Sequence, residues 1–361
     1  MFVALRDLVF ARGRFALMIV TIVLLTALVG LVSGLTVGLG RANTSAIDEL
    51  PADRLAFAAP APGQGVSFAD SSVDQGQWRR WAEQPGVRSA APLGISMTRL
   101  GAGDRTAAAA AFGVEPGGPL APGALVPGSV VLSRELADEL GVRAGATLTV
   151  GTGTPFTVAA VVSGSSYSHA PVAWTTLADW QPLGSGSPRE GPRATVIALD
   201  LDGTDRADLR AADHAAGTRS KTLDDARGAI GSFTAENGSL QLMRGFLFAI
   251  SALVVGAFFT VWTIQRAADV AVLKALGAPT GYLLRDALAQ ALVVLLVGTG
   301  VGIGATALFG VVAPGGVPFV LDVTTTVYPA AVLILLGMVG AGLAIRRVTS
   351  VDPHTALGGN R

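Results

Sequence analysis

The residue types that carry most protein chemistry are scarce in this chain. There is no cysteine, which excludes disulfide bonds and thiolate metal sites. The two lysines, Lys221 and Lys274, do not follow glycine in a Gly-Lys-Ser/Thr pattern, so the sequence holds no P-loop for ATP. The three histidines, His169, His214 and His354, lack zinc-ligand spacing, and no serine occupies a nucleophile elbow. The sequence therefore predicts a protein that is not an enzyme and has no metal or intrinsic cofactor.

Among the histidines, His169 is the best candidate ligand, because it lies beside Tyr167 in a serine-rich turn. A structural role in that turn is the interpretation we prefer. His214 falls in a polar predicted helix, where we expect it to be solvated, and His354 belongs to the C-terminal tail.

The most specific pattern is the segment 266–286, which predicts a short helix followed by a turn. Gly277 suits the end of that helix, and Pro279 follows where a helix must stop. The apolar positions of the helix are Val270, Leu273 and Leu276, and the charged positions are Arg266, Asp269 and Lys274. These residues alone leave two interpretations open. The segment either connects two membrane spans or also docks onto another protein.

Long runs without a charged residue surround this segment. A bilayer core about 30 Å thick needs roughly 20 apolar residues per helix. The runs predict four membrane spans, at 15–40, 243–265, 287–312 and 327–345. The first run is longer than the apolar core of a signal peptide, about 7–15 residues, so we expect it to remain as an anchor. Half of the residues are hydrophobic and the net charge is zero, which argues against disorder and against bulk binding of nucleic acid.

Basic residues near the span ends predict the orientation, because they concentrate in cytoplasmic loops. They are Arg6, Arg12 and Arg14 before the first span, Arg266, Lys274 and Arg285 between the second and third, and Arg346 and Arg347 after the fourth. The loop 313–326 has no Lys or Arg. We therefore predict a multi-pass protein of the bacterial cell membrane with both termini in the cytoplasm. Residues 1–14 would form a cytoplasmic amphipathic helix, and 346–361 a cytoplasmic tail.

The insert 41–242 is then extracytoplasmic, and its pattern predicts a mixed α+β domain. Strands are expected at 89–100, 106–114, 130–131, 147–150, 156–162 and 194–199, and 173–180 is expected to be a strand followed by a short helix. Helices are expected at 76–85, 133–140, 205–216 and 223–231, with Ser133 capping the second and Gly141 ending it. Residues 41–75 are expected to be part helix and part loop. The fold class is thus a membrane α-helical protein with four spans, arranged one plus three, and an extracellular α+β domain between the first two.

Gly30, Gly34 and Gly38 lie on one face of the first predicted span. Small residues at this spacing allow helices to approach closely in lipid. The stripe therefore predicts either packing within one subunit or, as the sharper hypothesis, the interface of a dimer.

Two motifs and the layout of the spans resemble a known family. The run Asp-Val-Ala-Val-Leu-Lys-Ala-Leu-Gly-Ala-Pro at 269–279 and the Asp-Pro…Ala-Leu tail at 352–357 are similar to motifs of the FtsX/MacB-type (type VII) ABC transporter permeases. The segments 39–47 and 166–174 are similar to the haem-exporter branch of that family, which includes HrtB- and DevC-like permeases. The resemblance covers essentially the whole chain.

The resemblance implies that 266–286 is the coupling-helix loop, which docks into a groove on a separate cytoplasmic ABC ATPase. The coupling residues would be Arg266, Asp269, Val270, Leu273, Lys274, Leu276 and Gly277. ATP and Mg²⁺ would be bound by that partner, and two permeases and two ATPases would form the complex. The other expected partner is the lipid bilayer.

The resemblance also implies haem, or a similar hydrophobic compound, as the exported substrate. Haem needs axial ligands, cations for its propionates and an apolar slot. Where the first two spans leave the membrane, the chain offers Glu49 and Met243 as ligands, Arg41 and Arg244 for the propionates, and Asp48. Each has a structural alternative, such as a helix cap, lipid packing or an arginine that reaches the headgroups.

Two further functions of the family remain open from the sequence. The cargo could be a drug, a peptide or a lipid. Alternatively, the permease could carry no cargo and relay the motion of the ATPase to an external cell-wall enzyme.

Overall fold

The computed structural model describes residues 12–349 except 152, 185–190, 204–205 and 314–316. Most of the predicted helix 1–14 and of the tail 346–361 lies outside the described residues. The chain divides into two compact units. We call Met1–Gly38 with Ser239–Arg361 the membrane unit, and Leu39–Gly238 the insert domain.

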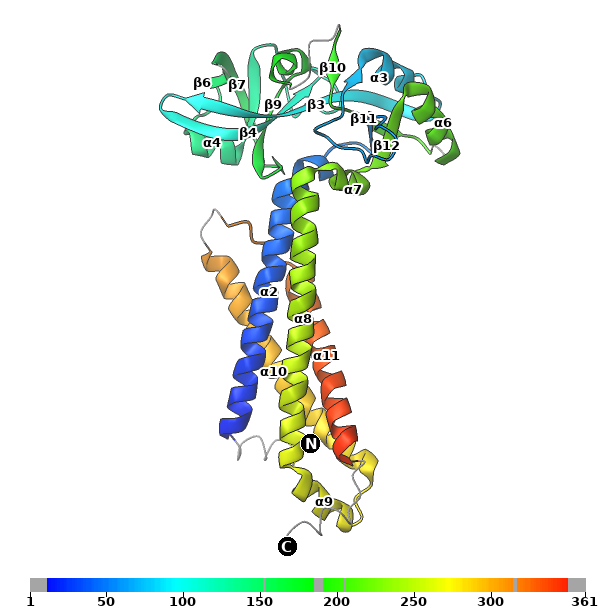
Figure 1. Ribbon diagram of the computed structural model, residues 1–361. Coiled ribbons are helices and arrows are strands. Elements are labelled where there is room, and N and C mark those ends of the chain that lie inside the picture. The colour runs from blue at the N-terminus through cyan, green and yellow to red at the C-terminus, as the bar shows by residue number, and fades with distance from the viewer. Residues whose placement is uncertain (1–11, 152, 185–190, 204–205, 314–316, 350–361) are drawn as a thin grey trace. The chain divides into compact units, whose positions relative to one another are not determined.

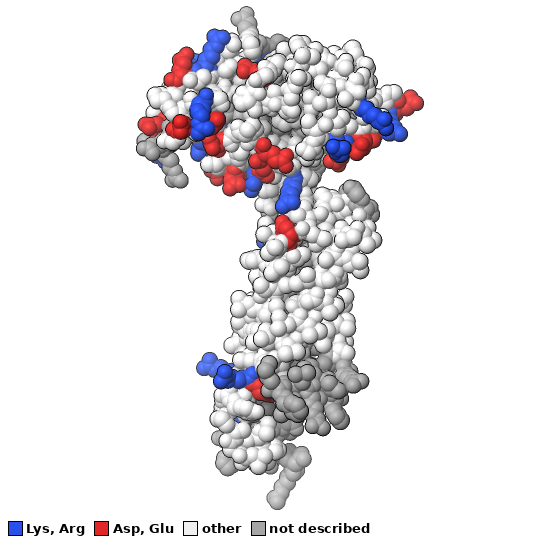
Figure 2. Space-filling view, turned by 180° about the vertical axis from the view of Figure 1, so that it is seen from behind, with Lys and Arg blue, Asp and Glu red and all other residues white. Residues whose placement is uncertain are grey.

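The membrane unit is built on four long apolar helices (Figure 1). They are α2 (Arg12–Asp48), α8 (Gly231–Gln265), α10 (Thr280–Val312) and α11 (Val323–Thr349), and the short helix α9 (Ala267–Ala275) follows α8. On the face drawn in Figure 2, the described surface of these spans is almost wholly uncharged, as contact with lipid requires. The predicted arrangement of one span plus three is confirmed.

Glycines bring the spans of the membrane unit close together. A Cβ placed on Gly298 or Gly302 of α10 would lie 2.6 Å from Ile22 or Thr26 of α2. On α8 and α11, a Cβ placed on Gly340 would lie 3.1 Å from the Cα of Gly256. Because glycine has no Cβ, the two helices of each pair can approach this closely.

The glycine stripe of α2 packs within the subunit. A Cβ on Gly30 would meet the Thr306 hydroxyl at 2.6 Å, and one on Gly34 would overlap the Phe319 ring. A Cβ on Gly38 would overlap the backbone carbonyl of Pro318. The hypothesis that these three glycines form the dimer interface is therefore wrong for the described structure, because the same chain already covers their face.

The α11 helix begins with a complete cap at Asp322. Its carboxylate accepts from the Thr325 amide at 2.9 Å, and the Thr325 hydroxyl in turn accepts from the Asp322 amide. The hydrogen bond from the Thr324 hydroxyl, with these backbone bonds, lowers the pKa of Asp322. The carboxylate therefore stays ionised at neutral pH, and its capping contribution is lost only when the pH falls through that lowered value.

The insert domain is built on a long mixed sheet, whose strands follow one another in the order β12-β1-β11-β3-β4-β9-β5-β7-β6. The strands are β1 Arg54–Ala58, β3 Val87–Ala102, β4 Arg105–Val114, β5 Ser129–Ser133, β6 Thr147–Val150, β7 Thr154–Val162, β8 Ser166–Tyr167, β9 Ala170–Thr176, β11 Val196–Leu201 and β12 Thr218–Thr222. The short strand β8 pairs with β9, and β2 (Val73–Asp74) pairs separately with β10 (Arg193–Ala194).

The long strand β3 belongs to two lobes. Its first half pairs with β11, while its far end also pairs with β6 through Leu100 and Gly101. That second pairing closes β3, β4, β9, β5, β7 and β6 into a ring around an apolar core that includes Leu132, Leu148 and Phe156.

Short helices cover the sheet. They are α3 (Gln75–Ala82), α4 (Arg134–Leu140), α5 (Leu177–Trp180), α6 (Arg206–Ala216) and α7 (Leu223–Ala226). Ser133 caps α4 by accepting from the Leu136 amide, and Gly141 ends it with φ of 67°. These caps are the predicted ones, and the α+β class of the insert is confirmed.

Strands β1 and β12 were among those missed in the sequence. β1 lies in the segment expected to be part helix and part loop, and all three of its central residues are buried. A strand buried on both faces lacks the alternation of polar and apolar residues that would reveal it. β12 is polar, with sequence Thr-Arg-Ser-Lys-Thr, because it forms the edge of the sheet beside β1. The predicted helix 223–231 is instead α7 followed by a 3-10 turn at Arg227–Ala229, and α8 begins at Gly231.

Candidate functional site

The segment predicted to couple to an ATPase folds as a short helix with a tight end. The helix α9 ends in a Schellman motif, in which the Gly277 amide donates to the Lys274 carbonyl and the Ala278 amide to the Leu273 carbonyl, both at 3.0 Å. Gly277 has φ of 90°, a conformation that favours glycine. The prediction that Gly277 ends this helix is confirmed.

Large apolar side chains at the end of α9 face outward. Leu276 is 80% exposed, Val272 59% and Leu273 44%. An exposed apolar group of this kind marks an interaction surface or a contact with lipid. Val272 was not among the predicted coupling residues. The side chains of the predicted residues Asp269 and Val270 lie outside what the structure describes.

The Arg266 side chain contacts residues of the neighbouring helices and does not form part of the exposed apolar surface of α9. Its Nη1 donates to Oε1 of Gln290 on α10 at 2.6 Å, and its guanidinium lies 5.2 Å from the centre of the Trp262 ring. Gln290 is buried, and its Nε2 donates to Asp286 at 3.0 Å. These contacts tie the start of α9 to α10. Gln290 was missed because its role depends on Arg266, which lies outside its own helix.

Within the insert domain, the turn after β8 docks on the end of α2. Ser168 and His169 have φ of 50° and 64°, unusual values for residues with a side chain. Their amides donate to the carbonyls of Asn43 and Ala42, both at 3.0 Å. Ser45 bonds through its hydroxyl to the backbone of Ser166. The two segments whose sequences resembled haem exporters, 39–47 and 166–174, therefore lie against each other.

A polar network joins this turn to the start of α8. Nε2 of His169 lies 2.8 Å from Oε2 of Glu236, and Nδ2 of Asn43 donates to the same oxygen at 3.1 Å. A carboxylate only accepts hydrogen bonds, so Nε2 of His169 is the protonated nitrogen. The two nitrogens lie 2.8 Å apart, which is then a contact between two donors rather than a bond.

Two serines complete the network. The Ser232 hydroxyl donates to Oδ1 of Asn43 at 2.6 Å, so the Ser168 hydroxyl, 2.8 Å away, donates to Ser232. We call Asn43, Ser168, His169, Ser232 and Glu236 the root network. His169 thus has the structural role that its sequence favoured, and the exposed His214 of α6 is the solvated residue expected.

Comparison with protein families gives two matches that together span most of the chain. Residues 15–215 match the MacB-like periplasmic core domain, and residues 242–353 match the FtsX-like permease C-terminal domain. The chain belongs to the FtsX/MacB-type ABC transporter permeases. It is therefore a member of a family of multi-pass transporter permeases.

Several relatives of this permease carry names. A Staphylococcus haemolyticus protein with the provisional name hemin transport system permease protein HrtB is 26% identical over 99% of both chains. A Staphylococcus epidermidis protein of the same name is 26% identical, but the match covers only 58% of each chain. The uncharacterized ABC transporter permease Rv2563 of Mycobacterium tuberculosis is 27% identical over 99% of both chains.

Among solved structures, the periplasmic region of MacB from Actinobacillus actinomycetemcomitans aligns with 51% of the permease and 95% of its own chain, with 14% identity and a TM-score of 0.36. The extracellular domain of the ABC-type transporter YknZ aligns with 47% of the permease and 98% of its own chain, with a TM-score of 0.36.

The residues expected to bind haem are divided between the two units of the permease. Arg41, Asp48 and Glu49 belong to the insert domain, and Met243 and Arg244 to the membrane unit. Glu49 is exposed just beyond α2, and Met243 is 51% exposed on α8. Arg41 is also exposed, and Arg244 is half-buried.

Asp48 is already engaged within the insert domain. Its Oδ1 accepts from Nε of Arg227 at 2.7 Å, and its Oδ2 accepts from the Thr44 hydroxyl at 2.8 Å. The hydrogen bond to Asp48 is the main cause of the raised pKa of Arg227. This pair joins the end of α2 to the turn before α8.

Proposed function

We propose that this chain is the permease subunit of an exporter that expels haem, or a similar hydrophobic compound, from the membrane. A separate cytoplasmic ATPase supplies the energy and acts through α9. Two permeases and two ATPases form the working complex. Both termini and α9 lie on the cytoplasmic side, in agreement with the basic residues near those span ends.

The observation that carries the proposal is the exposed apolar end of α9. Leu273 and Leu276 lie at a rigid Schellman turn, and Arg266 fixes the start of the helix through Gln290. An apolar patch at the end of a helix whose start is held in place suits insertion into a groove of another protein. The sequence around it resembles the coupling motif of the family, which supports an ATPase as the occupant.

The names of the relatives support haem as the cargo. The HrtB proteins are named as hemin transport permeases, and one aligns with this chain over nearly its whole length. In the proposal, Glu49 and Met243 are the axial ligands, and Arg41 and Arg244 pair with the propionates. Asp48, which is held by Arg227, fixes the helix end beside Glu49 rather than binding the iron.

The helices α2 and α8 are the proposed route for the motion. Each contributes residues to both units, since α2 runs from Arg12 to Asp48 and α8 from Gly231 to Gln265. ATP-driven closure of the ATPases would move α9, and the two helices would carry the movement to the insert domain. A cavity open to the outer leaflet would then close and release the cargo.

The coupling role is tested by Leu273→Asp, which places a charge in the proposed apolar contact. We expect export by cells that express the permease and its ATPase to fall to background, because burying an unpaired carboxylate in the groove is costly. The control is Leu273→Met, which keeps an apolar side chain of similar volume. Circular dichroism and co-purification with the second permease copy report whether the variant is folded.

Two outcomes would contradict the proposal. Full export by a folded Leu273→Asp variant would remove α9 as the coupling element. A complex whose ATPase works normally but moves no compound across the membrane would favour the alternative function, a relay to an external cell-wall enzyme.

A further inference from the structure

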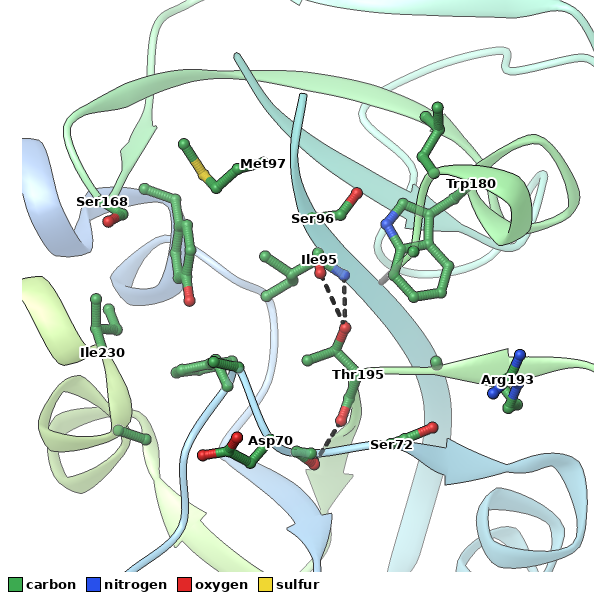
Figure 3. Close-up of a pocket in the computed structure, with 18 of the residues that line it drawn as sticks. Asp70, Ser72, Ile95, Ser96, Met97, Ser168, Trp180, Arg193, Thr195 and Ile230 are labelled. Carbon is green, nitrogen blue, oxygen red and sulfur yellow. Dashed lines mark hydrogen bonds between the residues drawn. The ribbon is translucent and has the colours of Figure 1, made fainter. Parts of the chain in front are cut away.

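One wall of a cavity of about 530 Å³ in the insert domain is held by hydrogen bonds within the protein (Figure 3). The Thr195 hydroxyl accepts from the Ile95 amide at 2.8 Å and donates to the Ile95 carbonyl at 3.2 Å. The Ser71 hydroxyl donates to the Thr195 carbonyl at 2.7 Å. These bonds join segments of the insert domain to one another, so the side chains that make them serve its fold.

Gln290, in the membrane unit, is a buried polar residue with a different arrangement of partners. It lies on α10 and is only 1% exposed. Its Oε1 accepts from Nη1 of Arg266 at 2.6 Å, and its Nε2 donates to Asp286 at 3.0 Å. An arginine only donates hydrogen bonds and a carboxylate only accepts them. The orientation of the Gln290 amide between these two partners is therefore fixed.

The bond between Arg266 and Gln290 closes a loop of chain that contains α9. Arg266 directly precedes α9, and Gln290 lies 24 residues further along the chain, on α10. Between them the chain passes through α9, the tight turn at Gly277 and the first turns of α10. A loop whose ends are held together has fewer arrangements than an open one. The bond therefore restricts the orientation of α9 relative to α10.

Arg266 extends the same contact to α8. It follows Gln265, the last residue of α8, and its amide donates to the Trp262 carbonyl at 3.2 Å. Its guanidinium also lies 5.2 Å from the centre of the Trp262 ring, within the range of a cation–π interaction. Through Arg266, Gln290 thus joins α8, α9 and α10 at one point.

The two ends of α9 differ in how they are held. At its start, Arg266 makes a charge-assisted hydrogen bond, and such bonds are stronger than those between neutral groups. Because Gln290 is buried, water does not compete for its amide. At its other end, Leu273 and Leu276 are exposed. The helix is therefore held at one end and presents its apolar surface at the other.

We propose that Gln290 is a positioning residue for the partner ATPase, which acts through Arg266 and holds α9 in the orientation that the ATPase binds. This role rests on the proposed function of α9 in coupling. Gln290 is buried, so it affects the ATPase only through α9. Holding a segment in its bound orientation raises affinity, because less conformational freedom is lost on binding.

The first test measures the affinity of the ATPase for the full chain in lipid nanodiscs by biolayer interferometry. Gln290→Leu replaces the amide with an apolar side chain of similar size. We expect about tenfold weaker binding, the loss of one hydrogen bond to a charged group. Arg266→Met should weaken binding at least as much. The double variant should bind no more weakly than Arg266→Met alone, because both changes remove the same bond.

Thr299→Val is the matched control for these variants. Thr299 is also a buried polar residue of α10, but its hydroxyl donates to the Leu295 carbonyl of the same helix, at 2.7 Å. Removing that hydroxyl leaves the contact with Arg266 intact. The ATPase should therefore bind Thr299→Val as it binds the unmodified chain.

The second test measures the orientation of α9 directly, without the ATPase. The chain has no cysteine, so spin labels attach only where cysteines are introduced. Suitable exposed positions are Ala275 on α9 and Leu296 on α10. Labelled chains are diluted with unlabelled protein, so that double electron–electron resonance reports the distance within one chain. We expect Gln290→Leu to make the distance distribution about twofold broader, because α9 then moves relative to α10.

The outcomes separate this proposal from the proposed function. Unchanged ATPase affinity in Leu273→Asp would contradict docking on α9, and the role of Gln290 would fall with it. Weaker binding in Leu273→Asp together with unchanged binding in Gln290→Leu would retain docking on α9 but overturn the role of Gln290. Additive losses in the double variant, or an unchanged width of the distance distribution in Gln290→Leu, would also overturn it.

Discussion

At the scale of residues, the root network connects side chains that are far apart in the sequence. Asn43 is 126 residues from His169 and 193 residues from Glu236, yet their side chains meet. The network links the end of α2, the turn after β8 and the start of α8, all within the insert domain. His169 and Glu236 are only partly buried, so the bond between them contributes modestly, whereas Asn43 is buried. The bonds of the network hold the turn together.

The root network predicts a local effect of Glu236→Ala. Without the carboxylate, His169 and Asn43 lose their shared acceptor, which should weaken the docking of the turn by about 1 kcal/mol. Hydrogen exchange of the Ser168 and His169 amides, measured by mass spectrometry on the peptide that contains them, should then become about fivefold faster.

Glu139→Ala is the control for this experiment, since Glu139 is an exposed glutamate on α4 outside the network. Exchange at 168–169 should be unchanged in that variant. If Glu236→Ala also leaves exchange there unchanged, the side-chain network does not hold the turn, and its two backbone bonds alone suffice.

At this scale only part of the site could be predicted from the sequence. Local signals were sufficient for Gly277, whose place after an amphipathic run and before Pro279 defines a helix end. They were also sufficient for the role of His169 in a turn. They could not reveal Glu236 or Gln290, because a charged or amide residue in a helix looks solvated until its partner on another element is known.

At the scale of elements, glycine decides how the spans pack. Gly302 of α10 faces α2, where a Cβ would lie 2.6 Å from Thr26 and 2.9 Å from the Val23 carbonyl. Gly300 and Gly304 of the same helix have no atom within 4 Å of an added Cβ. Small residues at this spacing are typical of close helix packing, but the sequence alone does not separate the face that is packed from the face that is open.

This difference predicts opposite outcomes for two alanine substitutions on one helix. Gly302→Ala should destabilise the protein by about 1–3 kcal/mol, because the methyl group pushes against the backbone of α2. Gly300→Ala should leave stability unchanged or raise it slightly, because alanine favours the helix. Unfolding of the purified permease in mixed detergent measures the stability of each variant. Equal stability of the two variants would show that α2 and α10 do not pack through Gly302.

The missed strands β1 and β12 belong to this scale as well. A strand buried on both faces and a polar edge strand both lack period-two alternation, so only the pairing partner identifies them. The long apolar spans and the capped helix α4 were predictable because their signals are local.

At the scale of the whole molecule, three features bear on transport. The exposed apolar end of α9 is held in place by Arg266 and Gln290, and two long helices contribute to both units. The expected haem residues lie at the end of α2, directly after it, and on α8. The family and the four spans are established by the sequence matches and by the helices themselves. The central claim is that haem is the cargo, and membership of the family does not by itself establish the cargo.

The most direct test of that claim is the ATPase rate of the reconstituted permease–ATPase complex, measured while haem is titrated in and its absorbance is followed. The account predicts saturable stimulation together with a shifted haem band, both lost in Glu49→Ala and in Met243→Ala. Glu139→Ala, which changes an exposed glutamate far from both positions in the sequence, should retain them. A flat ATPase rate with an unshifted band would contradict the account and leave another hydrophobic cargo, or relay to an external enzyme, as the function.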